Sequence, residues 1–193
     1  MTNAYICTCP HCGTKNRIPE NRMATTARCG RCHESFSPQN VHKQEEVVLT
    51  LRCSNCRTKN RVPAAKLNAG AKCGRCAAAL QHQNVLTGTT VMVTDANFHQ
   101  TVVDSPLPVL LYAWSTTCPV CTTTGPQVEQ MASETKGKVR VAKLNVEANP
   151  HLATTYNVLS VPTFLIFDAG KLKEQIPGAV PKHDLLYKMA RYI

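Results

Sequence analysis

The sequence predicts an α/β domain, with a central mixed sheet flanked by helices, preceded by two small modules that depend on cysteine. Three observations predict this arrangement. A four-cysteine pattern occurs twice in the first half of the chain, the second half alternates strand-like and helix-like segments, and one further cysteine pair lies between two such segments. The length of 193 residues suits one or two domains of ordinary size.

The first half of the chain contains an internal duplication. Eight cysteines form four Cys-x2-Cys pairs, and an offset of 44 residues carries the first two pairs onto the second two. The same offset carries Lys15–Arg17 onto Lys59–Arg61. A fixed internal period of this kind indicates one structural unit used twice. We expect a first ribbon at 1–44, a second ribbon at 45–88 and a C-terminal domain at 89–193.

Each repeat is typical of a tetrahedral site of four thiolates. Two Cys-x2-Cys pairs with sixteen residues between them match the ligand spacing of a zinc ribbon. Each module has few large apolar side chains, so it needs a cross-link such as a bound metal ion to fold. We expect one Zn²⁺ per module, with the ligands Cys9, Cys12, Cys29 and Cys32 in the first and Cys53, Cys56, Cys73 and Cys76 in the second. The alternative is a set of disulfides, which a reducing compartment disfavours.

The charge is concentrated in the duplicated half. The net charge is +10, of which residues 1–88 carry +9 and residues 89–193 carry +1. Two Zn²⁺ bound by eight thiolates would lower the first figure to +5 (+9 − 8 + 4), which still permits an acidic partner or weak nucleic-acid contact. Few aromatic residues accompany the basic ones in this half, with only Tyr5 and Phe36, and base stacking on nucleic acid is poorly supported.

The location follows from what the sequence lacks. The segment Met1–Cys7 is short and polar and does not read as a signal peptide. The longest strongly apolar run, Val109–Trp114, is too short to span a bilayer. We expect a cytoplasmic protein that has no membrane segment.

Hydrophobic patterning in the C-terminal domain predicts strands and helices in alternation. The continuous apolar run Val109–Trp114 predicts a buried strand, and Cys118 opens a helix shortly after it. The other predicted strands are 91–93, 139–146, 163–167 and 173–176, and the other predicted helices are 94–103, 151–156 and 182–192. A βαβ pattern followed by a hairpin, with Cys-x2-Cys where a strand gives way to a helix, is typical of a thioredoxin-like fold.

The pair Cys118 and Cys121 is predicted to be a redox dithiol. A cysteine at a helix N-terminus faces unpaired N–H groups and the positive end of the helix dipole, which favours its thiolate. Cys118 would then attack a substrate disulfide, and Cys121, one helical turn later, would resolve the mixed disulfide. The alternative is half of another metal site, which lacks a second cysteine pair nearby.

Over nearly all of its length the C-terminal domain resembles the thioredoxin family. The motifs that carry the resemblance are Trp114 ahead of Cys118-Pro-Val-Cys121, Gly125-Pro126, 141–146, Asn149-Pro150, Val161-Pro162-Thr163, Gly170 and Gly178. A thioredoxin preceded by a four-cysteine module resembles the thioredoxin 2 group, from which this chain departs in having two such modules.

The resemblance implies a function and a site. It implies a protein-disulfide reductase that thioredoxin reductase recycles with NADPH. It also implies that Pro162 follows a cis peptide bond beside the dithiol, where the backbone of Val161 pairs with a substrate peptide. We therefore predict that substrate binds at Trp114, Pro119, Val161 and Pro162.

Three positions depart from the family pattern. Between the cysteines, Pro119-Val120 replaces the usual Gly-Pro, so Val120 keeps an N–H group that a proline would lack. Tyr112 occupies the place of a buried aspartate, although the usual lysine neighbour is present as Lys143. Thr117 replaces a tryptophan and removes an apolar contact surface. These departures predict a less reducing dithiol and an altered proton route to Cys121.

Two other classes of function remain open at this point. One is a redox-linked chaperone that holds unfolded clients on the apolar face around the dithiol. The other is a zinc-ribbon module that binds protein or nucleic acid, with weak reductase activity. The Cys-Pro-x-Cys motif also fits an oxidase or isomerase, which the expected intracellular location argues against.

Overall fold

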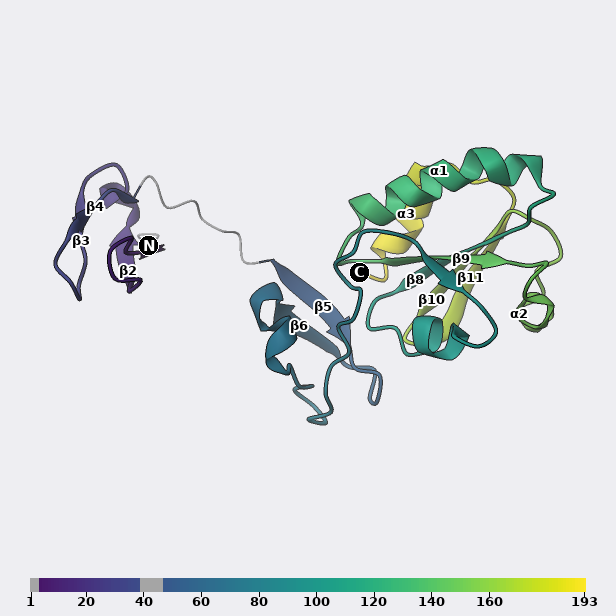
Figure 1. Ribbon diagram of the computed structural model, residues 1–193, viewed down its shortest axis with the longest axis horizontal. Helices are drawn as coiled ribbons and strands as arrows, with labels where there is room; N and C mark the ends of the chain where they lie inside the picture. Colours follow the sequence, from purple (N-terminus) through teal and green to yellow (C-terminus); the bar gives the residue numbers. More distant parts are fainter. Residues whose placement is uncertain (1–3, 39–46) are drawn as a thin grey trace. The chain divides into compact units, whose positions relative to one another are not determined.

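The computed structural model describes residues 4–38 and 47–193. The chain divides into two compact units, Met1–Glu46 and Val47–Ile193 (Figure 1). The expected boundary between the two ribbons, at residues 44 and 45, lies outside the described residues. Among the residues that are described, no helix has the length and apolar character needed to cross a membrane.

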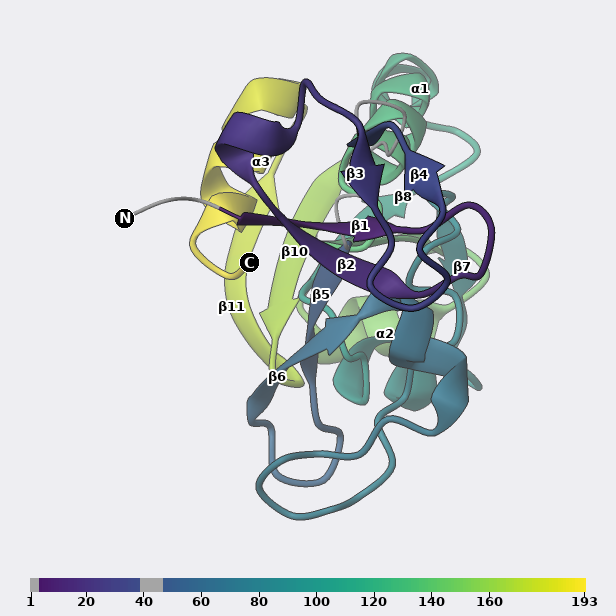
Figure 2. The same cartoon turned by 90° about the vertical axis from the view of Figure 1, so that its left-hand side faces the viewer.

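The first ribbon is built from two small antiparallel hairpins (Figure 2). Its elements are β1 (Ala4–Thr8) paired with β2 (Lys15–Pro19), the single turn η1 (Glu20–Arg22), and β3 (Ala27–Arg28) paired with β4 (Ser35–Phe36). Ile18 and Phe36 pack around the buried cysteine side chains. Sulfur therefore forms much of the core, as the scarcity of large apolar residues predicted.

The second ribbon repeats this plan. Its elements are β5 (Val48–Arg52) paired antiparallel with β6 (Lys59–Pro63), the short helix η3 (Ala64–Ala69), and a bridge between Lys72 and Ala79. Leu51 and Val62 are buried at its centre. Its apolar cluster also includes Leu107, a residue of the C-terminal domain, so the two pack against each other within one compact unit.

A five-stranded mixed sheet organises the C-terminal domain. Its strands, in spatial order, are β11 (Lys171–Pro177), β10 (Thr163–Asp168), β8 (Val109–Trp114), β9 (Arg140–Asn145) and β7 (Val91–Val93). The central strand β8 runs parallel to β9 and antiparallel to β10. The sheet confirms the predicted thioredoxin-like architecture.

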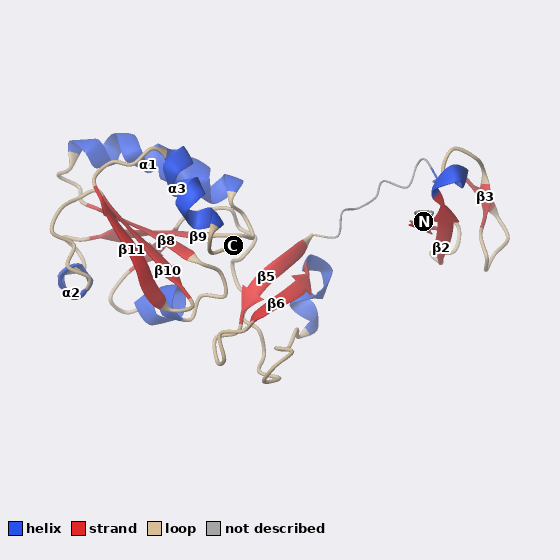
Figure 3. Ribbon diagram, turned by 180° about the vertical axis from the view of Figure 1, so that it is seen from behind, coloured by secondary structure: helices blue, strands red, loops and turns tan. Residues whose placement is uncertain are grey.

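Helices cover both faces of this sheet (Figures 1 and 3). The helices are α1 (Pro119–Glu134) and α3 (Lys182–Ala190) on one face, and α2 (Pro150–Thr155) and the wide turn η4 (His99–Val103) on the other. Alternate residues of β8 serve the two layers, because successive strand side chains point to opposite faces. Leu110 and Tyr112 contact the α1–α3 layer, whereas Leu111 contacts the other. This double burial explains the unbroken apolar run of β8.

The predicted segments correspond closely to the observed ones, with differences at their ends. The strand predicted at 173–176 extends over Lys171–Pro177, and the helix predicted at 182–192 ends at Ala190. The helix predicted at 94–103 is a wide turn over His99–Val103, in which Asp104 N–H donates to His99 O. Four-residue helical bonds from Phe98 N–H to Thr94 O and from Thr101 N–H to Asn97 O occur in the same segment, so the chain coils as predicted but widens toward its end.

Candidate functional site

The dithiol lies where β8 gives way to α1. Cys118 is the N-cap of α1 and has an extended backbone, with φ −92° and ψ 107°. Pro119 occupies the first helical position, where a missing N–H costs nothing. Cys121 lies in the first turn, with its Cα 5.3 Å from that of Cys118, and a disulfide joins the two residues. The helix start therefore holds the two sulfurs within bonding reach.

The helix N-terminus directs a backbone donor at Cys118. The N–H of Cys121 donates to Cys118 Sγ over 3.1 Å, which is the usual bond from the third helical residue to an N-cap side chain. Val120 also keeps its N–H group, but in the described part of the chain Cys121 is the backbone donor that reaches this sulfur. The remaining free N–H groups and the helix dipole favour negative charge at the same point.

The two sulfurs differ in their access to solvent. Cys118 is half-buried, whereas Cys121 is only 5% exposed. A large substrate disulfide can reach the first sulfur but cannot reach the second without rearrangement. The asymmetry distinguishes two otherwise similar sulfurs by their access to a large molecule.

The loop before β10 lies against Cys118. The peptide bond between Val161 and Pro162 is cis, as the resemblance implied. The Val161 carbonyl oxygen lies 3.7 Å from Cys118 Sγ. Val161 is half-buried and Pro162 is buried, while Pro119 is exposed beside the first sulfur. Cys118 and these three residues therefore occur together, as expected of one site.

A pocket opens on the other side of the dithiol, next to the buried Cys121. Its lining includes Tyr112, Trp114, Cys121, Glu129 and Lys143. Trp114 is half-buried, and the Lys143 ammonium lies 5.9 Å from the centre of its ring, within cation–π range. Trp114 thus forms a wall of the site as well as part of the core.

Lys143 is paired with a carboxylate that the sequence did not single out. Its Nζ donates to Glu129 Oε1 over 2.9 Å, and Thr90 Oγ1 donates to both oxygens of Glu129. Burial works to raise the pKa of Glu129, but Lys143 and Thr90 together lower it. Lys143 therefore has an ionised partner on α1, although position 112 offers it no carboxylate.

Thr117, which the sequence marked only as a replacement for tryptophan, forms a hydrogen bond that holds its loop in place. Its hydroxyl donates to Glu147 Oε1 over 3.0 Å, and the N–H and hydroxyl of Thr116 donate to Glu147 Oε2 over 3.2 and 2.6 Å. The bonds from Thr116, followed by those from Thr117, lower the pKa of Glu147. This carboxylate therefore ties the loop before Cys118 to the end of β9. No local sequence signal marks Glu147, since the contact spans thirty residues.

The two groups of four cysteines are each brought together. Within each group, all four Sγ atoms lie within 4.8 Å of one another. Cross-pair sulfur distances are 3.6 and 3.5 Å in the first ribbon and 3.6 Å for both pairs in the second. A tetrahedral zinc site with Zn–S of about 2.3 Å has sulfur–sulfur edges of about 3.8 Å. The eight cysteines could therefore hold two metal ions in the predicted sets.

At each site the backbone favours the thiolate of one ligand in particular. The N–H groups of Cys32 and Arg31 lower the pKa of Cys29 to about 5, and those of Cys76 and Arg75 lower the pKa of Cys73 to about 6. A backbone bond from Glu34 or Ala78 acts to lower the pKa of Cys32 or Cys76, but burial and the neighbouring sulfurs outweigh it and raise the pKa of Cys32 to about 12 and that of Cys76 to about 11. Metal binding requires deprotonated cysteine. The repeat thus preserves the donors around the ligands as well as the ligands themselves.

Comparisons with known proteins cover both halves of the chain. The family described as Thioredoxin matches residues 89–191, and the family described as Thioredoxin 2, N-terminal, matches residues 8–34 and 52–78. A thioredoxin of Synechocystis sp. is 39% identical over 104 residues, which are 54% of this chain and 97% of that protein.

Two further relatives extend the comparison. A thioredoxin 2 of Chlorobaculum tepidum is 36% identical over 108 residues, covering 56% of this chain and 99% of that protein. A bifunctional thioredoxin reductase/thioredoxin of Mycobacterium leprae is 41% identical over 99 residues, covering 51% of this chain and 22% of that protein. The chain belongs to the thioredoxin family, as a thioredoxin 2-like thiol–disulfide oxidoreductase with a duplicated N-terminal ribbon.

Proposed function

We propose that the protein reduces disulfides in other proteins through Cys118 and Cys121, and that two structural zinc ions support it. The observation that carries the proposal is the unequal exposure of two bonded sulfurs at one helix start. A half-exposed Cys118 suits attack on a large substrate, and a buried Cys121 suits the intramolecular step. The proposed organisation is a first ribbon at 1–44, a second ribbon at 45–88 and a redox domain at 89–193.

The proposed reaction begins with the reduced dithiol. The Cys118 thiolate attacks one sulfur of the substrate disulfide, forming a mixed disulfide and releasing the other substrate sulfur as a thiolate that takes up a proton. Cys121 then loses its proton and attacks Cys118 Sγ, which breaks the mixed disulfide and releases the second substrate thiol. Two electrons have moved to the substrate, and the enzyme is left with the Cys118–Cys121 bond.

The substrate would bind across the cis-proline loop. We assign Trp114, Pro119, Val161 and Pro162 to substrate binding. The Val161 carbonyl, which lies 3.7 Å from Cys118 Sγ, would accept a hydrogen bond from an extended substrate segment, in the manner of a strand added to a sheet edge. Such pairing would fix the substrate sulfur near Cys118 without requiring a particular substrate sequence.

The oxidised enzyme needs a source of two electrons. We propose thioredoxin reductase, with NADPH as the reductant, as the partner. The relative from Mycobacterium leprae, a bifunctional thioredoxin reductase/thioredoxin, supports this choice. A cytoplasmic location belongs to the same proposal, because eight metal-bound thiolates and a reduced dithiol suit a reducing compartment.

The four-cysteine sites would bind zinc as closed structural centres. Four thiolates fill the tetrahedral positions and leave no place for a reacting water, so hydrolytic chemistry is not expected there. Zinc would stabilise modules whose apolar cores are small. Because only thiolates bind the metal, oxidation of these cysteines would release it, which would make the ribbons redox sensors as well.

The test uses insulin reduction with thioredoxin reductase and NADPH. We expect the wild type to be active, Cys118→Ser to be inactive, and Cys121→Ser to accumulate a mixed disulfide with the substrate. An active Cys118→Ser variant would contradict the assigned roles. If instead the Cys118→Ser, Cys121→Ser double variant prevents aggregation of unfolded proteins and the wild type fails to reduce insulin, the chaperone alternative replaces this proposal.

Metal content is measured on the same preparations. We expect two zinc ions per chain, one lost on replacing any one four-cysteine set, and release on mild oxidation. Metal-free protein with normal reductase activity would remove zinc from the proposal and leave the dithiol chemistry intact.

A further inference from the structure

The two ribbons differ at the positions that contact the C-terminal domain. The offset of 44 residues places Arg52 of the second ribbon on Thr8 of the first, and Arg57 on Gly13. The four metal ligands are unchanged between the repeats, yet these two arginines occur in the second ribbon alone. Both arginines adjoin metal ligands, since Arg52 precedes Cys53 and Arg57 follows Cys56.

Arg52 forms a two-point ion pair with the C-terminal domain. Its Nε and Nη2 donate to the two carboxylate oxygens of Asp168 over 2.6 and 2.7 Å. The side chains are only 14% and 12% exposed, so water screens the pair weakly. The N–H of Arg52 also donates to the Pro106 carbonyl over 2.7 Å. A bidentate arginine–carboxylate pair of this kind fixes the relative orientation of the two side chains as well as their distance.

Arg57 makes the second anchor. Its Nη1 donates to the Val103 carbonyl over 2.8 Å, and its Nη2 lies 3.4 Å from Asp104 Oδ1. Arg57 has φ +61°, in the same left-handed region as Gly13 with φ +70°. Glycine adopts this conformation freely, whereas a residue with a Cβ pays a steric cost. Contacts with the C-terminal domain give a physical reason for an arginine at this turn.

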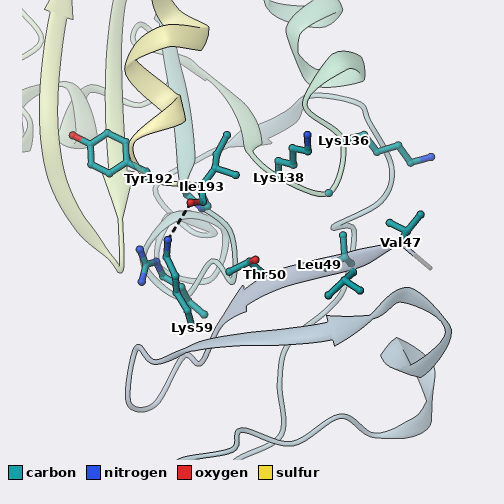
Figure 4. Close-up of a pocket in the computed structure, with 12 residues that line it drawn as sticks. Val47, Leu49, Thr50, Lys59, Lys136, Lys138, Tyr192 and Ile193 are labelled. Carbon is teal, nitrogen blue, oxygen red and sulfur yellow. Dashed lines mark hydrogen bonds between the residues drawn. The ribbon is translucent and has the colours of Figure 1, made fainter. Parts of the chain in front are cut away.

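An apolar seam and backbone bonds complete the contact. Leu49 and Leu107, both nearly fully buried, belong to one cluster. The N–H of Gly137 donates to the Val85 carbonyl over 3.0 Å, and a Cβ at Gly137 would lie 2.8 Å from Leu49 Cδ2. Figure 4 shows Leu49 at the pocket between the second ribbon and the C-terminal domain, and Lys59 donating to the Ile193 carbonyl, a bond of 3.2 Å. The surfaces therefore approach closely at Leu49 and Gly137 and leave a pocket between them beside this point.

This contact lies at the end of the sheet away from the dithiol. Pro106 precedes β8, whereas Cys118 follows it, and Asp168 ends β10, whereas Pro162 precedes it. Since β8 and β10 are antiparallel, Pro106 and Asp168 lie at one end of these two strands. Cys118 and Pro162 lie at the opposite end. The contact can therefore alter the stability of the domain without touching the reacting sulfurs.

We propose that the surface formed by Val103, Asp104, Pro106 and Asp168 is a docking surface specific for the second ribbon, recognised by Arg52 and Arg57. The two repeats therefore have different structural roles. The second ribbon is a structural part of the C-terminal domain, and the first lacks the arginines that would join it to that surface. A consequence, which rests on the proposed zinc sites, is that metal loss from the second ribbon destabilises the C-terminal domain.

The experiment gives the second ribbon the residues of the first. The full chain carrying Arg52→Thr and Arg57→Gly is unfolded in urea and followed by the fluorescence of Trp114, the single tryptophan, which reports on the C-terminal domain. We expect the midpoint to fall by an amount on the order of 1 M, as for loss of a buried ion pair, with unchanged metal content and unchanged insulin reduction in the absence of urea.

The matched control is Arg61→Thr, an exposed arginine on the same hairpin, for which we expect no change in the midpoint. Equal midpoints for the double variant and this control would overturn the proposal. If the double variant does not fold, Arg52→Lys, which keeps the charge but loses the fork, is measured instead. It should unfold at a lower urea concentration than the wild type, and a wild-type midpoint would again overturn the proposal.

A separate set of variants tests whether metal loss from the second ribbon destabilises the C-terminal domain. Cys53→Ser with Cys56→Ser removes one site, and Cys9→Ser with Cys12→Ser removes the equivalent site of the first ribbon. We expect only the former pair to lower the Trp114 midpoint. Equal effects of the two double Cys→Ser variants on the midpoint would overturn the proposal that the two ribbons have different structural roles. Wild-type protein without metal would refute the zinc proposal, while the arginine variants would still decide whether the docking surface exists.

Discussion

The hydroxyl of Tyr112 donates a hydrogen bond to the carbonyl oxygen of Cys121 over 3.0 Å. Tyr112 is 1% exposed and stacks on Phe164, with ring centres 5.2 Å apart. Burial raises the pKa of its phenol further above the reference value near 10. The residue that replaces the family's buried aspartate therefore stays protonated at neutral pH and supports the helix that carries Cys121.

Tyr112→Phe tests this supporting role. We expect a loss of about 1 kcal/mol in the free energy of unfolding, the typical value of one hydrogen bond, because the ring stacking remains. Insulin reduction should continue at the wild-type rate, since the phenol does not exchange its proton near pH 7. A large fall in rate without a loss of stability would show that the hydroxyl takes part in catalysis.

Tyr112→Asp tests the altered proton route. We expect faster disulfide reduction, because a carboxylate next to Cys121 can accept the proton of the resolving thiol. The same change empties part of the core behind α1 and should cost about 3 kcal/mol or more of stability. Rates are compared at a temperature where both proteins are folded, and a rate equal to or below that of Tyr112→Phe would reject the idea.

Restoring the family dipeptide tests the less reducing dithiol. In the Pro119→Gly, Val120→Pro variant, position 120 loses an N–H group at the start of α1. Within residues 4–38 and 47–193, Cys121 is the one backbone donor to Cys118 in the disulfide form, but the reduced thiolate carries a full charge that a second N–H would stabilise. We expect the variant to have the more negative redox potential, by a shift on the order of 30 mV. Equilibration with glutathione measures it, and a variant potential equal to or above that of the wild type would contradict the argument.

Thr117→Trp tests the contact surface next to the dithiol. A tryptophan should restore an apolar surface for thioredoxin reductase and lower the KM for that partner. It should also lose the bond to Glu147, although the two bonds from Thr116 remain. Thr117→Val serves as the control, because it loses the same bond without adding the aromatic surface. Equal KM values for the two variants would show that the surface is not used.

The pH dependence of stability tests the docking of α3. Lys188, followed by Tyr192 and Arg191, lowers the pKa of Glu174, against the raising effect of burial. A lowered pKa in the folded state means that the carboxylate stabilises the fold above its unfolded pKa, near 4.3, and loses that contribution as pH falls through the folded value.

We therefore expect the wild type to lose more stability than Glu174→Gln between about pH 5 and pH 3. Lys188→Gln should flatten the same interval in part, since Arg191 still faces the carboxylate. Urea midpoints across this range provide the measurement. Parallel curves for the wild type and Glu174→Gln would show that the ion pair contributes nothing to stability.

Many features of this protein can be predicted from local sequence patterns. The spacing of eight cysteines predicted the two groups of four that the structure brings together, because a metal-binding pattern relies on residues close along the chain. The apolar run of β8 and the cysteine pair after it located the dithiol at a helix start, because strand and helix periods are local properties. The cis bond before Pro162 came from the family resemblance, since no local rule distinguishes it from an ordinary strand-entry proline.

Other features depend on which distant residues meet. The bonds of Glu147 to the loop before Cys118 and the pairing of Glu129 with Lys143 join separate elements of the C-terminal domain. A comparison of the repeats could have marked Arg52 and Arg57 as two of the positions that differ, but not what they contact.

The sequence by itself determined the two ribbons, the order of strands and helices, and the cysteine pair that we propose to react. These follow from short-range spacing and periodicity. Only the tertiary structure decided that Tyr112 supports Cys121, that Cys118 is the accessible sulfur, and that the second ribbon packs on the C-terminal domain through Arg52 and Asp168. Those two residues are 116 positions apart, and folding alone brings such groups close enough for burial and charge to act.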